Sequence, residues 1–326
     1  MVDAPSMPLT LLGHENSLQR FVAEQQAGHL HHAWILHGLQ GIGKATLAKM
    51  MATAYLCEAM GREDSQACGV CHSCKMVAMD AHPDLLSLYR PVDKRDLTIA
   101  QVRDALSFLH YSGSNSERRV VILDDADSLN NQAANALLKG LEEPSRGAIL
   151  LMVCHDLAKL PATIRSRCML EACAPLLPQS MAQALAQLRI PEAYQALALQ
   201  LADGRPGMVV CMQDEAVSQA ISDWQAIVAN PEKMNIGHLQ DWMSTHLKSK
   251  QIPYHLIVQV VWNALQARGE NFYAGQSTSW HDQAALLAAI EAIMQWPSAL
   301  HRHTLRPEAS LFTLMLQLRE AAKRVV

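Results

Sequence analysis

The chain has 326 residues, of which 50% are apolar, and this length exceeds that of one typical domain, so we expect two or three domains with cores of their own. Aromatic residues are scarce at 5%, and the formal net charge is −4 at pH 7. These values exclude a strongly basic surface that would hold nucleic acid by charge alone. Any contact with DNA must therefore be local or shared with partner proteins.

The first 12 residues include Asp3, Pro5 and Pro8 and lack the basic and apolar stretches of a signal peptide. No uncharged apolar run approaches the roughly 18 residues of a membrane span. We therefore expect a cytoplasmic protein without membrane association. In such a reducing compartment, the eight cysteines are expected to be thiols or metal ligands and not disulfides.

The first half of the chain alternates short apolar runs with amphipathic stretches. Strands are predicted at 33–36, 85–89, 120–123 and 149–153, and helices at 44–60, 98–110 and 131–143. Strands separated by helices in this way indicate a mostly parallel sheet covered on both faces. The sequence thus predicts an α/β domain over about residues 1–175.

The second half of the chain shows helical patterning throughout. Pro175 and Pro178 resist helix and sheet alike and therefore predict a linker. Two all-α domains are expected after it, at 178–214 and 215–326. Breaks between helices are predicted near 230–231, 252–253, 269–279 and 296–297.

A phosphate-binding loop, or P-loop, is predicted immediately after the first strand. Gly38, Gly41, Gly43 and Lys44 give the spacing Gly-x4-Gly-Lys between a strand and a helix. Glycines in this context let backbone N–H groups surround phosphates, while the lysine faces the β- and γ-phosphates. The loop therefore predicts a site for ATP or ADP.

The magnesium side of this site is degenerate. Ala45 follows the lysine where the pattern requires a Ser or Thr hydroxyl, and Thr46 lies about 100° further round the helix. The third strand ends in Asp124 and Asp125, which match the acids that hold Mg²⁺ through water and polarise the attacking water. The second acid is usually Glu, and Asp125 is one methylene shorter. We expect bound nucleotide with little or no hydrolysis, and a poorly held Mg²⁺.

Four cysteines lie close together in the sequence with the spacing Cys-x10-Cys-x2-Cys-x2-Cys, namely Cys57, Cys68, Cys71 and Cys74. Four soft ligands at this spacing suit a tetrahedral Zn²⁺ with no open position, so we expect a structural zinc. Two alternatives stay open. Either His72 or His82 replaces one thiolate, or the cysteines are reduced and carry no metal.

Three further motifs complete the pattern: Leu12-Gly13-His14, the stretch Asn-Ala-Leu-Leu-Lys-Gly-Leu-Glu-Glu-Pro at 135–144, and Ser166-Arg167-Cys168. With the P-loop and the cysteines, they resemble the bacterial DNA polymerase III clamp-loader branch of the AAA+ family over about residues 8–175. The resemblance implies a RecA-like P-loop domain with an embedded zinc module, followed by a helical lid and a helical collar domain. The resemblance also places residues 12–14 near the adenine base of the nucleotide.

By the same resemblance, Arg167 is an arginine finger that stabilises transition-state charge in the ATP site of an adjacent subunit, a role worth about 10³–10⁵ in rate in comparable NTPases. The family's motor subunits, γ/τ, carry Thr after the P-loop lysine, Glu as the second acid and a lid arginine. Here these positions are Ala45, Asp125 and Gly207, and Cys154 or His155 takes the place of a sensor Thr. The chain therefore resembles a stator that hydrolyses little or no ATP itself.

The resemblance implies γ/τ and δ subunits as partners and, through the complex, the sliding clamp and primed DNA. One alternative is an active γ/τ-like ATPase that uses Thr46 and Asp125. Another is a zinc element that reads DNA directly. Few basic residues, Arg62 and Lys75, lie in or beside that segment, which argues against it because phosphate contacts dominate such binding.

Overall fold

The computed structural model describes residues 11–59, 67–90, 96–110, 118–247, 251–274, 280–303 and 306–325. Arg62 of the cysteine segment and part of the predicted 269–279 break lie outside the described residues. The chain divides into two compact units, Met1–Ser180 and Met181–Val326.

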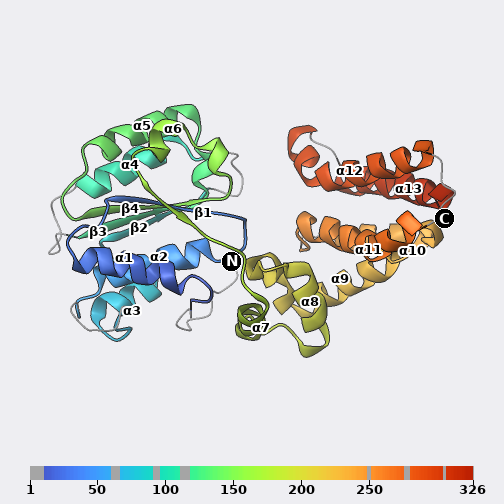
Figure 1. The fold of residues 1–326 in the computed structure, drawn as a ribbon, viewed down its shortest axis with the longest axis horizontal. Helices are drawn as coiled ribbons and strands as arrows, with labels where there is room; N and C mark the ends of the chain where they lie inside the picture. Colours follow the sequence, from blue (N-terminus) through green and yellow to red (C-terminus); the bar gives the residue numbers. More distant parts are fainter. Residues whose placement is uncertain are drawn as a thin grey trace. The chain divides into compact units, whose positions relative to one another are not determined.

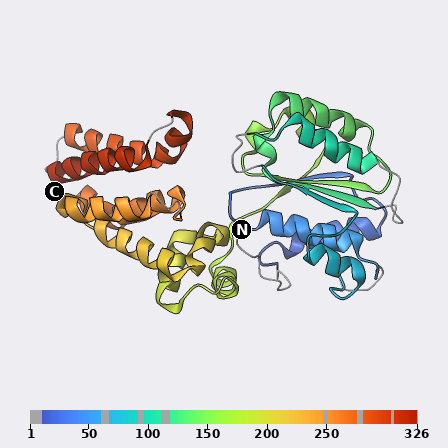
Figure 2. The same cartoon turned by 180° about the vertical axis from the view of Figure 1, so that it is seen from behind.

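The first unit is a three-layer α/β sandwich around a parallel sheet with the strand order β2-β3-β4-β1-β5. Its strands are β1 (Ala33–His37), β2 (Leu85–Leu88), β3 (Arg119–Leu123), β4 (Ala148–Cys154) and β5 (Met169–Ala172). One face of the sheet is covered by α1 (Glu15–Gln26) and α2 (Lys44–Leu56), and α3 (His72–Ala78) packs against α2 on the side away from the sheet (Figure 1). The other is covered by α4 (Ile99–His110), α5 (Asn131–Glu142) and α6 (Ala162–Arg165), as the view from behind also shows (Figure 2).

The pleat of the central strands explains their uninterrupted apolar sequences. In β1, Trp34 and Leu36 enter the core beneath α1 and α2, whereas Ala33 and Ile35 enter the core beneath α4 and α5. All seven residues of β4 are buried. Because both faces are covered, both sets of alternating side chains must be apolar. The parallel sheet predicted from the sequence is confirmed.

The register of the strands sets where the loops between them lie. His37 at the end of β1 pairs with Cys154 at the end of β4, and Leu123 at the end of β3 pairs with Met152. The segments that follow β1, β3 and β4 therefore leave the sheet at one edge. In parallel α/β sheets, this carboxyl edge is where ligands bind.

Two local predictions for the first unit were wrong or incomplete. The helix after the P-loop ends at Leu56 and not at residue 60, because Cys57 adopts an extended backbone with ψ 131°. Strand β5 was not predicted at all. It has four residues, lies at the edge of the sheet and is half-buried, so its sequence lacks the apolar run of the central strands.

The second unit consists of helices. These are α7 (Pro178–Gln187, which begins in the first unit), α8 (Gln195–Ala202), α9 (Glu215–Val228), α10 (Ile236–His246), α11 (Tyr254–Ala274), α12 (Trp280–His303) and α13 (Pro307–Val325). Single turns of 3₁₀-helix occur in this unit at η3 (Glu192–Tyr194) and η5 (Pro231–Lys233), with a longer one at η4 (Pro206–Gln213). Two further turns, η1 (Ala126–Ser128) and η2 (Leu157–Lys159), belong to the first unit. The breaks near 230 and 252 are confirmed. The division of this unit into a lid and a collar stays a prediction.

The predicted break at 296–297 is wrong, because α12 continues through Pro297. Trp296 is 1% exposed, and its indole Nε1 donates to Ser310 Oγ on α13 at 2.8 Å. Packing against α13 thus holds the helix together where proline removes a backbone hydrogen bond. Helix α11 likewise runs past Gly269, to Ala274. Among the described residues, no helix is both long and apolar enough to cross a membrane.

Replacing Trp34 by alanine should lower the free energy of unfolding by about 3–5 kcal/mol, because this side chain is fully buried against Phe21 and its removal leaves a cavity. Tyr89→Ala is the matched control, since Tyr89 is 58% exposed and should cost less than about 0.5 kcal/mol. Urea unfolding followed by circular dichroism measures both. Equal losses would contradict the assigned core.

Candidate functional site

The predicted P-loop occupies the turn between β1 and α2, and three of its residues have backbone angles that favour glycine. The φ values are +145° at Gly38, +84° at Gly41 and +97° at Gly43. A Cβ atom on Gly38 would lie 2.3 Å from the carbonyl oxygen of Cys173. The loop conformation therefore requires the glycines that the sequence pattern identified.

Lys44, the first residue of α2, is turned back onto the loop. Its side chain is buried, and Nζ donates to the carbonyl oxygens of Gly38 at 2.7 Å and Leu39 at 2.6 Å. Burial lowers the pKa of the Lys44 amine, an effect that nearby Cys and Asp groups oppose. A nucleotide phosphate would have to replace these two carbonyls as the partner of the ammonium group.

The segment Leu12-Gly13-His14 lies against the same loop. His14 is buried, and its Nε2 donates to the carbonyl oxygen of Ile42 at 2.8 Å. The imidazole also stands 3.8 Å from the place where Gly43 would carry a Cβ atom. This contact supports the loop from outside. A role of the segment near adenine stays a prediction.

The first turn of α2 offers an exposed methyl group at Ala45, where a hydroxyl would ligate magnesium. Thr46, the next residue, is half-buried on a different side of the helix. Nothing in this turn restores the missing oxygen at position 45.

The two acids after β3 are in different environments. Asp124 Oδ1 accepts from the backbone N–H of Asp125 at 2.9 Å, and burial raises the pKa of the Asp124 carboxyl. Asp125 has a left-handed backbone with φ 60°, and its carboxylate forms an ion pair with Nε of Arg90. The second acid is thus held by a guanidinium group, and it would have to leave this ion pair to contact an attacking water.

Sequence reasoning missed Arg90, although a signal for it was available. Arg90 follows the predicted strand 85–89, and Leu88 of β2 pairs with Leu123 of β3. Residues just beyond two paired parallel strands lie at the same edge, so Arg90 and Asp125 were candidates for a contact.

Asp127 and His155 were also missed as neighbours of this site. The backbone N–H of His155 donates to Asp127 Oδ1 at 2.8 Å, which ties the end of β4 to the turn after β3. Ligand atoms of Asp125, Asp127 and His155 lie within 4.8 Å of one another. Arg90 beside Asp125, and Lys159 3.9 Å from Asp127, offset the negative charge of this group.

Arg167 follows the short helix α6 and is 39% exposed at its side chain. Nη2 forms an ion pair with Glu142 Oε1 at 2.9 Å, and Nη1 donates to the carbonyl oxygen of Thr163 at 3.1 Å. A guanidinium has five N–H donors, so donors remain for a further acceptor. Glu142 was part of a quoted motif, but its contact with Arg167 was not predicted.

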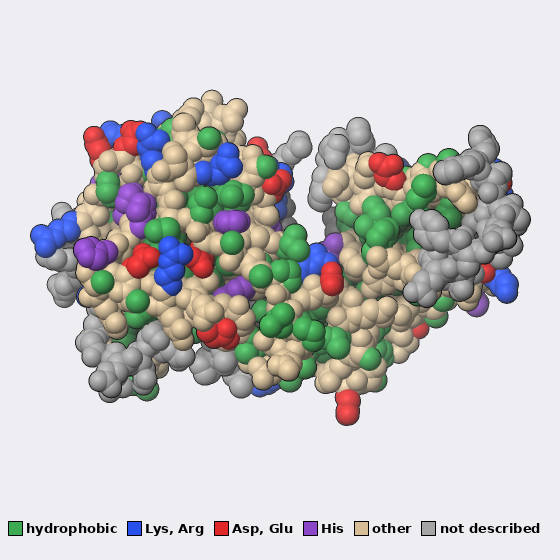
Figure 3. Space-filling view, in the orientation of Figure 1, with side chains coloured by type: hydrophobic (Ala, Val, Ile, Leu, Met, Phe, Trp, Pro, Cys, Tyr) green, Lys and Arg blue, Asp and Glu red, His purple; other side chains and the backbone are tan. Residues whose placement is uncertain are grey.

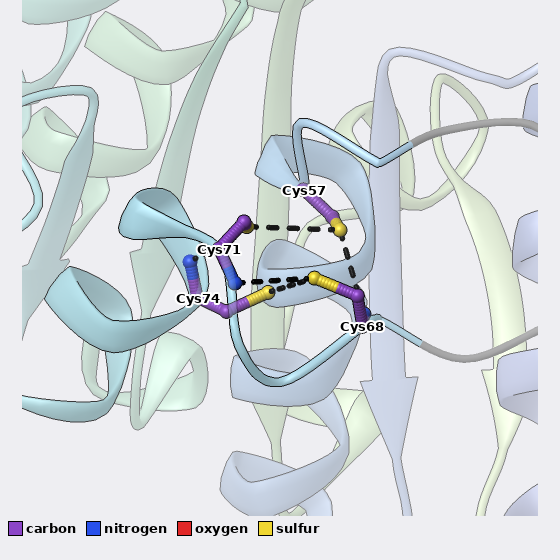
Figure 4. Close-up of side chains that lie close together, drawn as sticks. All are labelled: Cys57, Cys68, Cys71 and Cys74. Atoms are coloured by element: carbon purple, nitrogen blue, oxygen red, sulfur yellow. Dashed lines mark hydrogen bonds between the residues drawn. The ribbon is translucent and has the colours of Figure 1, made fainter.

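The four cysteines converge with their sulfur atoms toward one point (Figure 4). Cys57 comes from the end of α2, Cys68 and Cys71 from the following turn, and Cys74 from α3. The sulfur atoms of Cys57 and Cys71 are 4.0 Å apart, and those of Cys68 and Cys74 are 3.9 Å apart. A tetrahedral zinc with bonds of about 2.3 Å has sulfur–sulfur edges of about 3.8 Å, so the four residues fit a Zn²⁺ ion.

Backbone groups around the sulfur atoms favour thiolates. The N–H groups of Cys68, Cys71 and Cys74 point at the sulfur atoms of Cys57, Cys68 and Cys71, at 3.3–3.4 Å. Hydrogen bonds from the backbone of Val70 and Cys71 lower the pKa of Cys68 to about 6. Burial raises the pKa of Cys57 and Cys74.

The two histidines considered as alternative ligands are not among the four converging groups. His82 instead shares hydrogen bonds through Nε2 with Ser73 Oγ and through Nδ1 with the N–H of Asp84. Ser73 in turn donates to Glu58 Oε1 from both its N–H and its hydroxyl. This network braces the segment around the sulfur atoms and leaves all four ligand positions to cysteine.

Charges on the face of the first unit seen in Figure 3 are mixed, and acidic, basic and histidine side chains alternate there without a broad basic area. This distribution agrees with the net charge of −4. It gives no support to direct DNA binding by the described part of that face.

A parallel sheet in the order β2-β3-β4-β1-β5, with a glycine loop after β1 and acids after β3, defines a P-loop α/β protein of the AAA+ type. Residues 13–176 match the family described as DNA polymerase III, delta subunit. The chain belongs to this family.

Relatives within the family carry a more specific name. A DNA polymerase III subunit delta′ from Pseudomonas aeruginosa is 38% identical over 169 residues, which cover 48% of this chain and 51% of that protein. A subunit delta′ from Escherichia coli is 29% identical over 257 residues, covering 74% of this chain and 76% of the relative. The chain thus spans about half of the first relative's length. Its similarity is to the δ′ type of clamp-loader subunit.

A solved structure shows the same fold over most of the chain. The DNA polymerase III gamma subunit-related protein of Thermotoga maritima matches with a TM-score of 0.52 and 16% identity. The match covers 94% of this chain and 99% of that one. The arrangement of a parallel α/β unit followed by helices is therefore shared.

Gly38→Ala should destabilise the protein more than Gly28→Ala, although both glycines have positive φ. A Cβ at Gly28 has no heavy atom within 4 Å, so only backbone strain of about 1–2 kcal/mol is expected there. At Gly38 the Cys173 carbonyl must also move, which adds at least about 1 kcal/mol. Urea unfolding of both variants measures the difference, and equal values would mean that the P-loop conformation is not the one described.

Proposed function

We propose that this protein is a stator subunit of a DNA polymerase III clamp loader that supplies an arginine finger to a neighbouring ATPase subunit and hydrolyses little or no ATP itself. One contrast carries the proposal. The second acid, Asp125, is paired with Arg90, and Ala45 lacks the magnesium-binding hydroxyl, while Arg167 is exposed with donors to spare. The groups that would hydrolyse ATP in this subunit are missing or paired, whereas the arginine that would act on a neighbouring subunit is present.

A bound nucleotide in this proposal is ATP or ADP, held by the loop of Gly38, Gly41, Gly43 and Lys44. Phosphate oxygens would take the place of the two carbonyls that now accept from the lysine. Asp124 is the remaining candidate for holding Mg²⁺ through water, but its half-buried carboxyl has a raised pKa and position 45 offers no oxygen. The ion would be held poorly.

The four-cysteine cluster is proposed to hold a structural Zn²⁺. The fit of its sulfur–sulfur distances to a tetrahedral site and the absence of histidine from the ligand group support this assignment. The metal would fix the turn between α2 and α3, a segment with few apolar residues of its own.

The partners in this proposal are γ/τ and δ subunits, and the sliding clamp and primed DNA are engaged through the complex. The names of the relatives, DNA polymerase III subunits, support it. In the second unit, residues 178–214 would form the lid domain and 215–326 the collar that joins the other subunits.

The rival function is an active γ/τ-like ATPase. Thr46 would have to replace the missing hydroxyl, and Asp125 would have to leave Arg90 to act as the base. The half-buried position of Thr46 and the ion pair both argue against this rival.

In a complex reconstituted from this chain with γ/τ and δ, Arg167→Ala should lower the DNA-dependent ATPase. The ATP site of the neighbouring subunit, which Arg167 serves, should lose about 10³–10⁵ in rate. The ATPase rate of the whole complex should therefore fall by the fraction that this one site contributes. The isolated chain should show no ATP turnover that depends on Lys44. An unchanged ATPase of the Arg167→Ala complex would refute the finger role, and turnover by the lone chain that Lys44→Ala abolishes would favour the rival.

The purified protein should contain about one zinc per chain by elemental analysis. Cys71→Ser should remove it and make the segment between α2 and α3 more sensitive to limited proteolysis, because the ion supplies its folding energy. Cys211→Ser is the matched control, since this half-buried cysteine lies outside the cluster, and it should keep the metal. A metal-free wild-type protein, prepared reduced and with zinc supplied, would contradict the assignment.

A further inference from the structure

The guanidinium of Arg167 is held in place by acceptors of two kinds. The carbonyl oxygen of Thr163 and, at 3.5 Å, Ser166 Oγ are neutral and lie within or beside α6. The third acceptor is the carboxylate of Glu142, the last residue of α5, at 2.9 Å from Nη2. The side chain therefore reaches from the turn after α6 to the end of α5.

The charged acceptor differs from the neutral ones in what it does to an incoming anion. A carbonyl or hydroxyl oxygen can keep its hydrogen bond while the guanidinium binds a phosphate with its other N–H groups. A carboxylate in contact with the same guanidinium cancels its charge and repels the phosphate, most strongly where an interface excludes water. Of the contacts made by Arg167, the one with Glu142 is in conflict with phosphate binding.

We propose that Glu142 is a positioning residue that holds Arg167 against α5 in the free subunit and competes with the phosphate offered by an adjacent subunit. The inference rests on the finger role proposed above. Thr163 and Ser166 can keep their contacts with Nη1 of Arg167, and only the ion pair has to open on assembly. The carboxylate of Glu142 keeps the guanidinium of Arg167 paired until the phosphate of an adjacent subunit's nucleotide replaces it.

The exposure of the two side chains to solvent sets how strongly Glu142 competes with the phosphate for Arg167. The side chain of Arg167 is 39% exposed and that of Glu142 53%, so water screens the pair. Exposed ion pairs of this kind shift equilibria by about two- to fivefold. The effect of removing the carboxylate should lie in that range, well below the effect of removing the arginine.

The first test uses the isolated chain and does not depend on the finger role. The rate at which phenylglyoxal modifies Arg167, measured by peptide mapping, should rise about two- to fivefold in Glu142→Gln. Glu143→Gln is the matched control, because it removes the same charge from the exposed neighbouring residue and should leave the rate unchanged. An unchanged or lower rate in Glu142→Gln, or an equal rise in both variants, would overturn the proposal.

The second test uses the complex reconstituted with γ/τ and δ. Glu142→Gln should lower the ATP concentration needed for half-maximal ATPase by about two- to fivefold, and it should have no effect in an Arg167→Ala background. If Arg167→Ala lowers the ATPase but Glu142→Gln leaves that concentration unchanged or raises it, the competition is wrong and the finger stands. If Arg167→Ala itself has no effect, the finger role fails, and the modification rates still decide whether Glu142 holds Arg167.

Discussion

The structure depends on a parallel sheet that is covered on both faces. Because both sets of alternating side chains are buried, the register between strands is tightly specified, and His37, Leu123 and Cys154 end their strands at the same edge. The glycine loop, the acid pair and His155 are brought together by this register, although they are far apart in the sequence. A slip of one residue in β1 would exchange Trp34 for Ile35 between two different cores.

At that edge, most charged groups are paired within the chain. The ammonium of Lys44 donates to loop carbonyls, and the carboxylate of Asp125 meets Arg90. Asp127 accepts from the backbone of His155. A site for nucleotide hydrolysis normally leaves such groups to phosphate, metal and water. Internal pairing and the missing hydroxyl at Ala45 are two separate features that both disfavour catalysis, and both are compatible with a subunit whose proposed contribution is made to a neighbour.

The sequence was informative where the requirement is local. The P-loop depends on glycines within six residues, and the cysteine spacing is set by turns, so both could be predicted from the chain alone. Contacts between separate elements could not be predicted in the same way. Glu142 and Arg167 come from the ends of two different helices, and either residue alone would be an ordinary surface charge. Pro297 was misread for a related reason, since packing of Trp296 against α13 outweighs the local preference of proline.

One helix connects the two candidate sites. Helix α2 begins at Lys44, in the P-loop, and the next residue after its end is Cys57, the first of the four thiols. Thirteen residues of helix make a rod about 20 Å long. Because both ends belong to one hydrogen-bonded helix, inserting or deleting a single residue within α2 would turn Cys57 relative to Lys44 by about 100° and could not be absorbed at one site alone.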